Sequence, residues 1–162
     1  MSYRNFSQKS RIIKDALYMD YDNQYSYDPI NVEEINIEAW RYFFSYYRYY
    51  IDEFATNCLE IKLYDFQKVI LRAMMKYKES MFIASRGLGK SWLCAVFMVC
   101  YAILFPGVKI GIVSGKGQQS RNVIIQKIKG ELYKTNENIA REIINIKTGQ
   151  DDCVVEFKNG SE

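Results

Sequence analysis

The chain has 162 residues, of which 49% are apolar and 25% are charged, with 22 Lys and Arg, 19 Asp and Glu, and no His. This composition is typical of a globular domain and disfavours wholesale disorder. Without histidine, the chain has no Ser-His-Asp or Cys-His nucleophile system, no histidine acid or base and no histidine-containing zinc site.

The four cysteines include no C-x-x-C pair, which excludes a zinc knuckle and a redox motif of that type. Cys94 and Cys100 are predicted to be small core side chains, because they lie in an apolar run. That uncharged run, Trp92 to Phe105, has 14 residues, whereas a membrane span needs about 20. With no secretory leader at the start, we expect a soluble intracellular protein.

Charge and tyrosine divide the sequence near residue 60. Residues 1–60 have a net charge of −4 and contain 10 of the 14 tyrosines, whereas residues 61–162 have a net charge of +7. We therefore predict an N-terminal arm with an aromatic helix over 1–60, and a mildly basic second domain over 61–162. The positive charge is compatible with binding to a polyanion.

The first 30 residues show no sustained apolar period and are interpreted as an arm or a loosely packed helix. From Ile37 to Cys58, aromatic and apolar residues recur at three- and four-residue steps, which predicts one face of a helix. Such a face is usually core or a seam between elements, and a base-stacking platform is the alternative.

From Tyr64 onward, helices and strands are predicted to alternate. Asp65 is the expected N-cap of a helix whose buried side holds Phe66, Val69, Ile70, Ala73 and Met74. The other expected helices cover 90–105, 118–132 and 139–146, and the strands cover 80–85, 108–114 and 153–157. This order predicts an α/β fold, a P-loop NTPase-type parallel sheet flanked by helices, with the N-terminal helical arm added.

The clearest motif is Ala-Ser-Arg-Gly-Leu-Gly-Lys-Ser at residues 84–91, a P-loop pattern whose first glycine is replaced by alanine. Backbone N–H groups of such a loop converge on phosphates, and the following helix directs its positive end at the same anion. Lys90 is expected to contact the β- and γ-phosphates of ATP, and the Ser91 hydroxyl is the expected ligand of Mg²⁺. Arg86 is a candidate for sensing or stabilising the γ-phosphate.

Residues on either side of this loop complete the candidate site. Gln67 precedes the loop, and its carboxamide has the donor and acceptor that match the N6/N7 edge of adenine. Lys116 and Arg121 follow the strand predicted at 108–114. They are candidates for contacts with nucleic-acid phosphates, the alternative being a flexible loop with a helix cap.

The acidic residue that a P-loop ATPase needs at the end of another strand is missing from its expected place. The pair Asp151-Asp152 precedes the predicted strand at 153–157 instead of following it. Asn159-Gly160 is a hairpin signal whose return strand would come later. We therefore expect these residues to be the front part of a longer protein.

Three segments together resemble the large terminase subunit of tailed bacteriophages: Trp40-Arg41-Tyr42-Phe43, Tyr64-Asp65-Phe66-Gln67-Lys68 and the loop at 84–91. Phe157-Lys158-Asn159-Gly160-Ser161 matches the hairpin before that family's second acidic motif. The resemblance covers about residues 36–162. It implies the N-terminal part of an ATPase domain, with the Walker B acids, coupling motif and nuclease beyond Glu162.

The resemblance also implies an ATP-driven motor that packages double-stranded DNA in the cytoplasm of the bacterial host. Its expected partners are the portal protein, the small terminase subunit and copies of itself in a ring. Lys90 and Arg86 would be catalytic in the full-length protein, and this chain alone would hydrolyse almost no ATP. The residues expected to bind the nucleotide are Gln67, Ser85, Arg86, Gly87, Leu88, Gly89, Lys90 and Ser91.

Two other functions remain open on the sequence. A helicase-like, nucleic-acid-dependent ATPase also combines an upstream glutamine with a P-loop. A non-hydrolysing nucleotide-binding module, whose tyrosine-rich helix docks a partner, would need the loop but no acidic residue.

Overall fold

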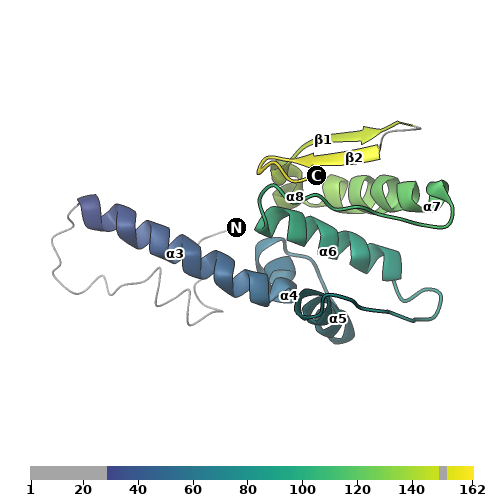
Figure 1. Ribbon diagram of the computed structural model, residues 1–162, viewed down its shortest axis with the longest axis horizontal. Helices are drawn as coiled ribbons and strands as arrows, with labels where there is room; N and C mark the ends of the chain where they lie inside the picture. Colours follow the sequence, from purple (N-terminus) through teal and green to yellow (C-terminus); the bar gives the residue numbers. More distant parts are fainter. Residues whose placement is uncertain (1–28, 150–152) are drawn as a thin grey trace. The chain divides into compact units, whose positions relative to one another are not determined.

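The computed structural model describes residues 29–149 and 153–162, with side chains from residue 37 onward, and is shown in Figure 1. The chain divides into two compact units, Met1–Tyr49 and Tyr50–Glu162, a boundary somewhat earlier than the charge break. The expected arm lies outside the described residues up to residue 28.

The described part of the first unit is the helix α3 (Pro29–Tyr49). Its first residue is a proline, which suits the first turn of a helix because its missing N–H would have no partner there. The aromatic rings predicted to share one face do contact one another. Phe43 lies edge-on to Tyr47 at 4.9 Å between ring centroids and to Trp40 at 5.4 Å.

The helix predicted to run on to Cys58 is instead interrupted at Tyr50, whose φ of −111° and ψ of 65° are not helical. Two short helices follow, α4 (Ile51–Glu53) and the π-helix η1 (Phe54–Cys58). The Leu59 N–H donates to the Phe54 carbonyl, the i to i+5 spacing that defines a π turn.

In the second unit, the predicted central helix is confirmed as α6 (Lys90–Leu104). The remaining helices are α5 (Asp65–Lys76), α7 (Gly117–Asn122), the π-helix η2 (Val123–Tyr133) and α8 (Glu137–Glu142). In Figure 1, α6 lies between α5 on one side and the α7–η2 helix on the other. Its inward residues form much of the core: Leu93, Ala95, Val96, Val99, Cys100, Ala102 and Leu104.

The only sheet in the described residues is an antiparallel pair, β1 (Ile143–Thr148) and β2 (Cys153–Phe157). Ile146 pairs with Val155, and the Lys147 ammonium lies 2.7 Å from a Glu156 carboxylate oxygen across the pair. The strand predicted at 153–157 is therefore confirmed, but the helix predicted over 139–146 ends at Glu142 and gives way to β1. The β-branched residues after Glu142 favour a strand. Its partner β2 follows only a few residues later in the chain, so little entropy is lost when the two strands pair.

The predicted parallel P-loop sheet is wrong for the described residues. Residues 80–85 and 108–114 form no strand, and Ile83 and Val113 are 86% and 95% exposed. Apolar composition alone therefore misidentified these segments. A strand also needs a partner along its length, and within the described residues the backbone of 108–114 bonds to the backbone of another segment only at Val108 and Ile110, both to the single residue Glu162. The described part of the chain is mostly helical.

The Asn159-Gly160 turn is present and closes the C-terminal end of α6. The Asn159 amide donates to the carbonyls of Ala102 and Ile103 at 2.7 and 3.1 Å, and the Ser161 hydroxyl donates to the Phe105 carbonyl. These bonds satisfy carbonyl groups that a helix end leaves without partners. Beyond the turn, the Glu162 backbone bonds to the Val108 carbonyl and the Ile110 N–H, beside a Lys109–Glu162 ion pair of 2.6 Å.

Asn136 is expected to be the most sensitive capping residue. Its side-chain oxygen accepts a bond from the Ile139 N–H at 3.1 Å, and its amide donates to the Leu59 carbonyl. Asn136→Ala removes both bonds and is expected to lower the free energy of unfolding by about 1.5 kcal/mol, measured by urea denaturation. Asn136→Ser keeps a capping oxygen and should lose roughly half as much; equal losses in the two variants would contradict this role for the cap.

The predictions for the two cysteines of α6 have different outcomes. Cys100 is fully buried, and burial raises the pKa of its thiol well above the ordinary value, as expected for a core side chain. Cys94, on the same helix, is exposed instead.

None of the helices in the described residues has the length and apolar character that a membrane crossing requires.

Candidate functional site

The candidate phosphate loop connects the exposed segment 81–85 to the first turn of α6. Gly87 and Gly89 have φ values of 96° and 72°, and Gly89 is the N-cap of the helix. Residues with a Cβ rarely adopt these left-handed conformations, so the two glycines allow the chain to reverse into α6. The predicted need for glycine at these two positions is thus confirmed.

The Lys90 side chain turns back toward the start of the loop. Its Nζ donates to the Ala84 carbonyl at 2.5 Å and to the Ser85 carbonyl at 2.7 Å. A lysine at the first position of a helix is unfavourable for the helix dipole, so these two carbonyl contacts compensate for an otherwise poor placement. The ammonium group is therefore held beside the loop, at the N-terminal end of α6.

Gln67 reaches the same loop from α5. Its side chain is buried, with 6% exposed, and the amide nitrogen lies 3.7 Å from the position that a Cβ on Gly89 would take. The amide oxygen accepts the Tyr64 N–H at 3.0 Å, which is one half of a capping box. The structure thus places Gln67 beside Gly89, a contact that the sequence alone did not establish.

The remaining loop residues are open to solvent. Ser85, Arg86 and Leu88 are exposed, and so is Ser91 in the first turn of α6. The Arg86 guanidinium forms no hydrogen bond or ion pair with the residues that the structure describes. A loop whose polar side chains face solvent is accessible to a ligand.

Two exposed aromatic residues come just before Gln67 in the chain and were not predicted to be site residues. The rings of Tyr64 and Phe66 are nearly parallel, at 9°, with centroids 6.0 Å apart, and they are 73% and 44% exposed. Phe66 was expected to be buried on α5, together with Val69, but Val69 is 67% exposed. The buried face of α5 instead carries Gln67 and Leu71.

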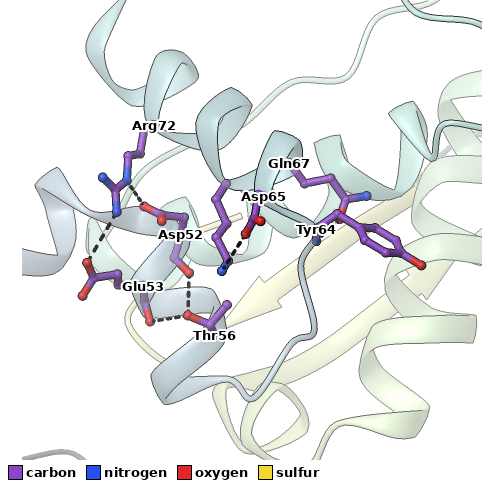
Figure 2. Close-up of polar contacts among 8 residues, drawn as sticks. Asp52, Glu53, Thr56, Tyr64, Asp65, Gln67 and Arg72 are labelled. Atoms are coloured by element: carbon purple, nitrogen blue, oxygen red, sulfur yellow. Dashed lines mark hydrogen bonds and ion pairs between the residues drawn. The ribbon is translucent and has the colours of Figure 1, made fainter. Parts of the chain in front are cut away.

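A charged cluster attaches α5 to α4, as Figure 2 shows. The Arg72 Nε donates to the Asp52 carboxylate at 2.7 Å, and its Nη2 lies 3.4 Å from Glu53. The guanidinium carbon is 4.9 Å from the centre of the Tyr50 ring. Asp52 is 1% exposed, and its hydrogen bond with Arg72 raises the pKa of the guanidinium. This cluster positions the helix that carries Gln67.

Lys116 is the N-cap of α7, where the helix-cap alternative gains support, and Arg121 lies in the last turn of the same helix. The Ser114 hydroxyl donates to the Lys116 carbonyl at 2.6 Å and accepts the Ser120 N–H at 3.1 Å. Arg121 lines a cavity of about 420 Å³ with residues of α6, η2 and β2, including Met98, Ile124 and Val155. Gln67 and the loop at 84–91 do not line this cavity.

No group of three or more Cys, Asp or Glu side chains suited to a metal occurs in the described residues. Asp151-Asp152, the late acidic pair, lies outside them. Ser91, in the first turn of α6, is exposed, and its hydroxyl is an oxygen donor. Such a donor fits an ion that takes most of its ligands from nucleotide phosphates and water, and would not hold Mg²⁺ unaided.

Comparison with known proteins leaves the chain without an assigned family. No protein-family model matches the sequence, and no curated protein matches it.

Proposed function

We propose that the loop at 84–91 binds the phosphates of ATP together with Mg²⁺. The observation that carries this proposal is the Lys90 ammonium group, held against the Ala84 and Ser85 carbonyls at the start of a 15-residue helix. Loop N–H groups and the helix N-terminus favour an anion at such a position. Phosphate oxygens would replace the two carbonyls as partners of the ammonium group and form stronger, charge-assisted bonds.

Three further residues have proposed roles around that anion. The exposed Arg86 guanidinium would contact the γ-phosphate, and the Ser91 hydroxyl would be a ligand of Mg²⁺. The ion, when bound, supplies positive charge that neutralises the phosphate oxygens. Gln67, which lies beside Gly89, would contact the base.

We further propose, from the resemblance of the motifs, that the chain is the N-terminal ATPase portion of a phage terminase large subunit. Hydrolysis of ATP in the full-length protein would drive double-stranded DNA into a procapsid in the cytoplasm of the bacterial host. The portal protein, the small terminase subunit and further copies of the chain in a ring would be its partners. The chain of 162 residues would bind the nucleotide but hydrolyse almost none of it.

Calorimetric titration with ATP, ADP and AMP in the presence of Mg²⁺ tests the phosphate loop. We expect ATP and ADP to bind, and AMP to bind at least about tenfold more weakly, because it lacks the phosphates that Lys90 would contact. Equal affinity for AMP and ATP, or no binding of any nucleotide, would overturn the proposal.

A further inference from the structure

We propose that the cavity lined by α6, η2 and β2 binds the anion of a small aliphatic carboxylic acid, with the Arg121 guanidinium as partner of the carboxylate. This site is separate from the proposed nucleotide site, because Gln67 and the loop at 84–91 do not line the cavity. Binding here is therefore independent of ATP binding at the loop.

The size and walls of the cavity suit a small apolar molecule. Its volume of about 420 Å³ falls in the range of about 300 to 1,000 Å³ that is typical of ligand pockets. Met98 of α6 and Val155 of β2 line it, with Ile124 of η2, the helix that continues α7 (Figure 1). Such walls offer water few hydrogen bonds, whereas an aliphatic chain is stabilised by burial against them.

The charges on the lining favour a monoanion. The charged side chains among the described lining residues are Lys109, Arg121 and Glu162. Lys109 and Glu162 form an ion pair of 2.6 Å, so their charges compensate each other. Arg121 forms no hydrogen bond or ion pair with the residues that the structure describes. The described lining thus has one uncompensated positive charge, which matches a carboxylate better than a doubly charged phosphate.

The Arg121 Nε is a donor without an acceptor. It is covered by neighbouring atoms, and no hydrogen-bond partner for it is found among the described residues. A covered donor of this kind is costly, and native structures rarely retain one. Rotation of the side chain toward the cavity would let Nε and one Nη bind the two oxygens of a carboxylate, which is the geometry that a guanidinium fork fits best.

Apolar side chains continue along the helix from Arg121. Ile124 and Ile128 follow it by three and seven residues, which places them on the same side, and both line the cavity. A chain that extends from a carboxylate at Arg121 would therefore lie along the two isoleucines. Each methylene group that it removes from water should tighten binding by about fourfold.

Calorimetric titration of the 162-residue chain with butanoate, hexanoate and octanoate tests the apolar part of the site. We expect octanoate to bind most tightly, with a gain of about fourfold for each added methylene group. The affinity for 1-octanol should be at least about tenfold lower than that for octanoate, because the alcohol has no charge for Arg121. Equal affinity for butanoate and octanoate, or no binding of octanoate, would overturn the proposal.

Saturation with ATP and Mg²⁺ distinguishes this cavity from the phosphate loop. The affinity for octanoate should stay unchanged, since the two sites share no residues. Displacement of octanoate by ATP would place its carboxylate at the loop and overturn the cavity site. If octanoate binds as described and ATP does not bind, the proposed nucleotide function is wrong and the cavity site stands.

Arg121→Met removes the charge and keeps an apolar side chain of similar length. Its affinities for octanoate and 1-octanol are expected to agree within about threefold. Arg141→Met is the matched control, because Arg141 is an exposed arginine of α8 that does not line the cavity. Octanoate affinity in the control should change less than about twofold. A preference for octanoate that persists in Arg121→Met, or equal losses in the two variants, would contradict the role of Arg121.

Ile124→Trp fills the cavity and tests its position by a second route. We expect this variant to bind octanoate at least about tenfold more weakly, because the indole occupies the space of the aliphatic chain. Its affinity for ATP should equal that of the unaltered chain, and circular dichroism confirms that each variant is folded. Unchanged binding of octanoate to folded Ile124→Trp would exclude the cavity as its site.

Discussion

Replacing Lys90 with alanine is expected to weaken binding of ATP with Mg²⁺ by about 30- to 100-fold. The substitution removes the one ammonium group held beside the loop by the Ala84 and Ser85 carbonyls. Its charge-assisted bonds to phosphate oxygens should contribute about 2.0 to 2.7 kcal/mol of binding free energy, which corresponds to that change in affinity. Calorimetric titration of the 162-residue chain provides the measurement.

Lys78→Ala is the matched control for this experiment. Lys78 is an exposed lysine between α5 and the loop, so its removal changes the net charge equally without altering the site. Affinity should change less than about twofold in the control, because exposed charges are screened by salt. Equal losses in the two variants would show that net charge governs binding, and an unchanged affinity in Lys90→Ala would exclude the loop as the phosphate site.

Arg72→Met is expected to lower the free energy of unfolding by about 3 kcal/mol. Asp52 is 1% exposed, and Arg72 is the cationic partner of its carboxylate, at 2.7 Å. The Arg72 side chain is 46% exposed, but the carboxylate it bonds to is buried. Removing the arginine therefore leaves a buried charge without compensation, which costs more than the pair itself contributes. Chemical denaturation monitored by circular dichroism would measure the loss.

Two further variants separate this effect from the loss of an arginine in general. Arg141 forms an exposed ion pair with Glu137 at 3.6 Å, so Arg141→Met should cost less than about 0.5 kcal/mol. Adding Asp52→Asn to Arg72→Met should restore part of the stability, because it removes the uncompensated charge. A loss below about 1 kcal/mol in Arg72→Met would refute the role assigned to the pair.

Local signals in the sequence were sufficient for α6 and for the loop before it. The uncharged run from Trp92 to Phe105, followed by Pro106-Gly107, predicted a buried helix and its end, and the structure confirms both. The glycines at 87 and 89 were predicted from the conformations that a tight loop requires, and both have positive φ.

The same reasoning failed where an apolar segment needed a partner. Ile83 and Val113 belong to segments that were predicted to be strands, yet both side chains are exposed. The helix predicted through Ile146 stops early because Ile143–Thr148 pairs with Cys153–Phe157. Helical and strand preferences of such short apolar runs are similar, so the available partner decides between them.

The sequence by itself determined which residues begin and end the central helix and which positions of the loop require glycine. Those properties depend on the conformations of neighbouring residues, and neighbours are visible in a sequence. Only the tertiary structure decided that Gln67 lies against Gly89, that its carbonyl bonds to the Tyr64 N–H, and that Arg72 compensates the buried charge of Asp52. The contacts with Gly89 and Asp52 join residues far apart in the chain, and burial makes each depend on the packing of whole helices.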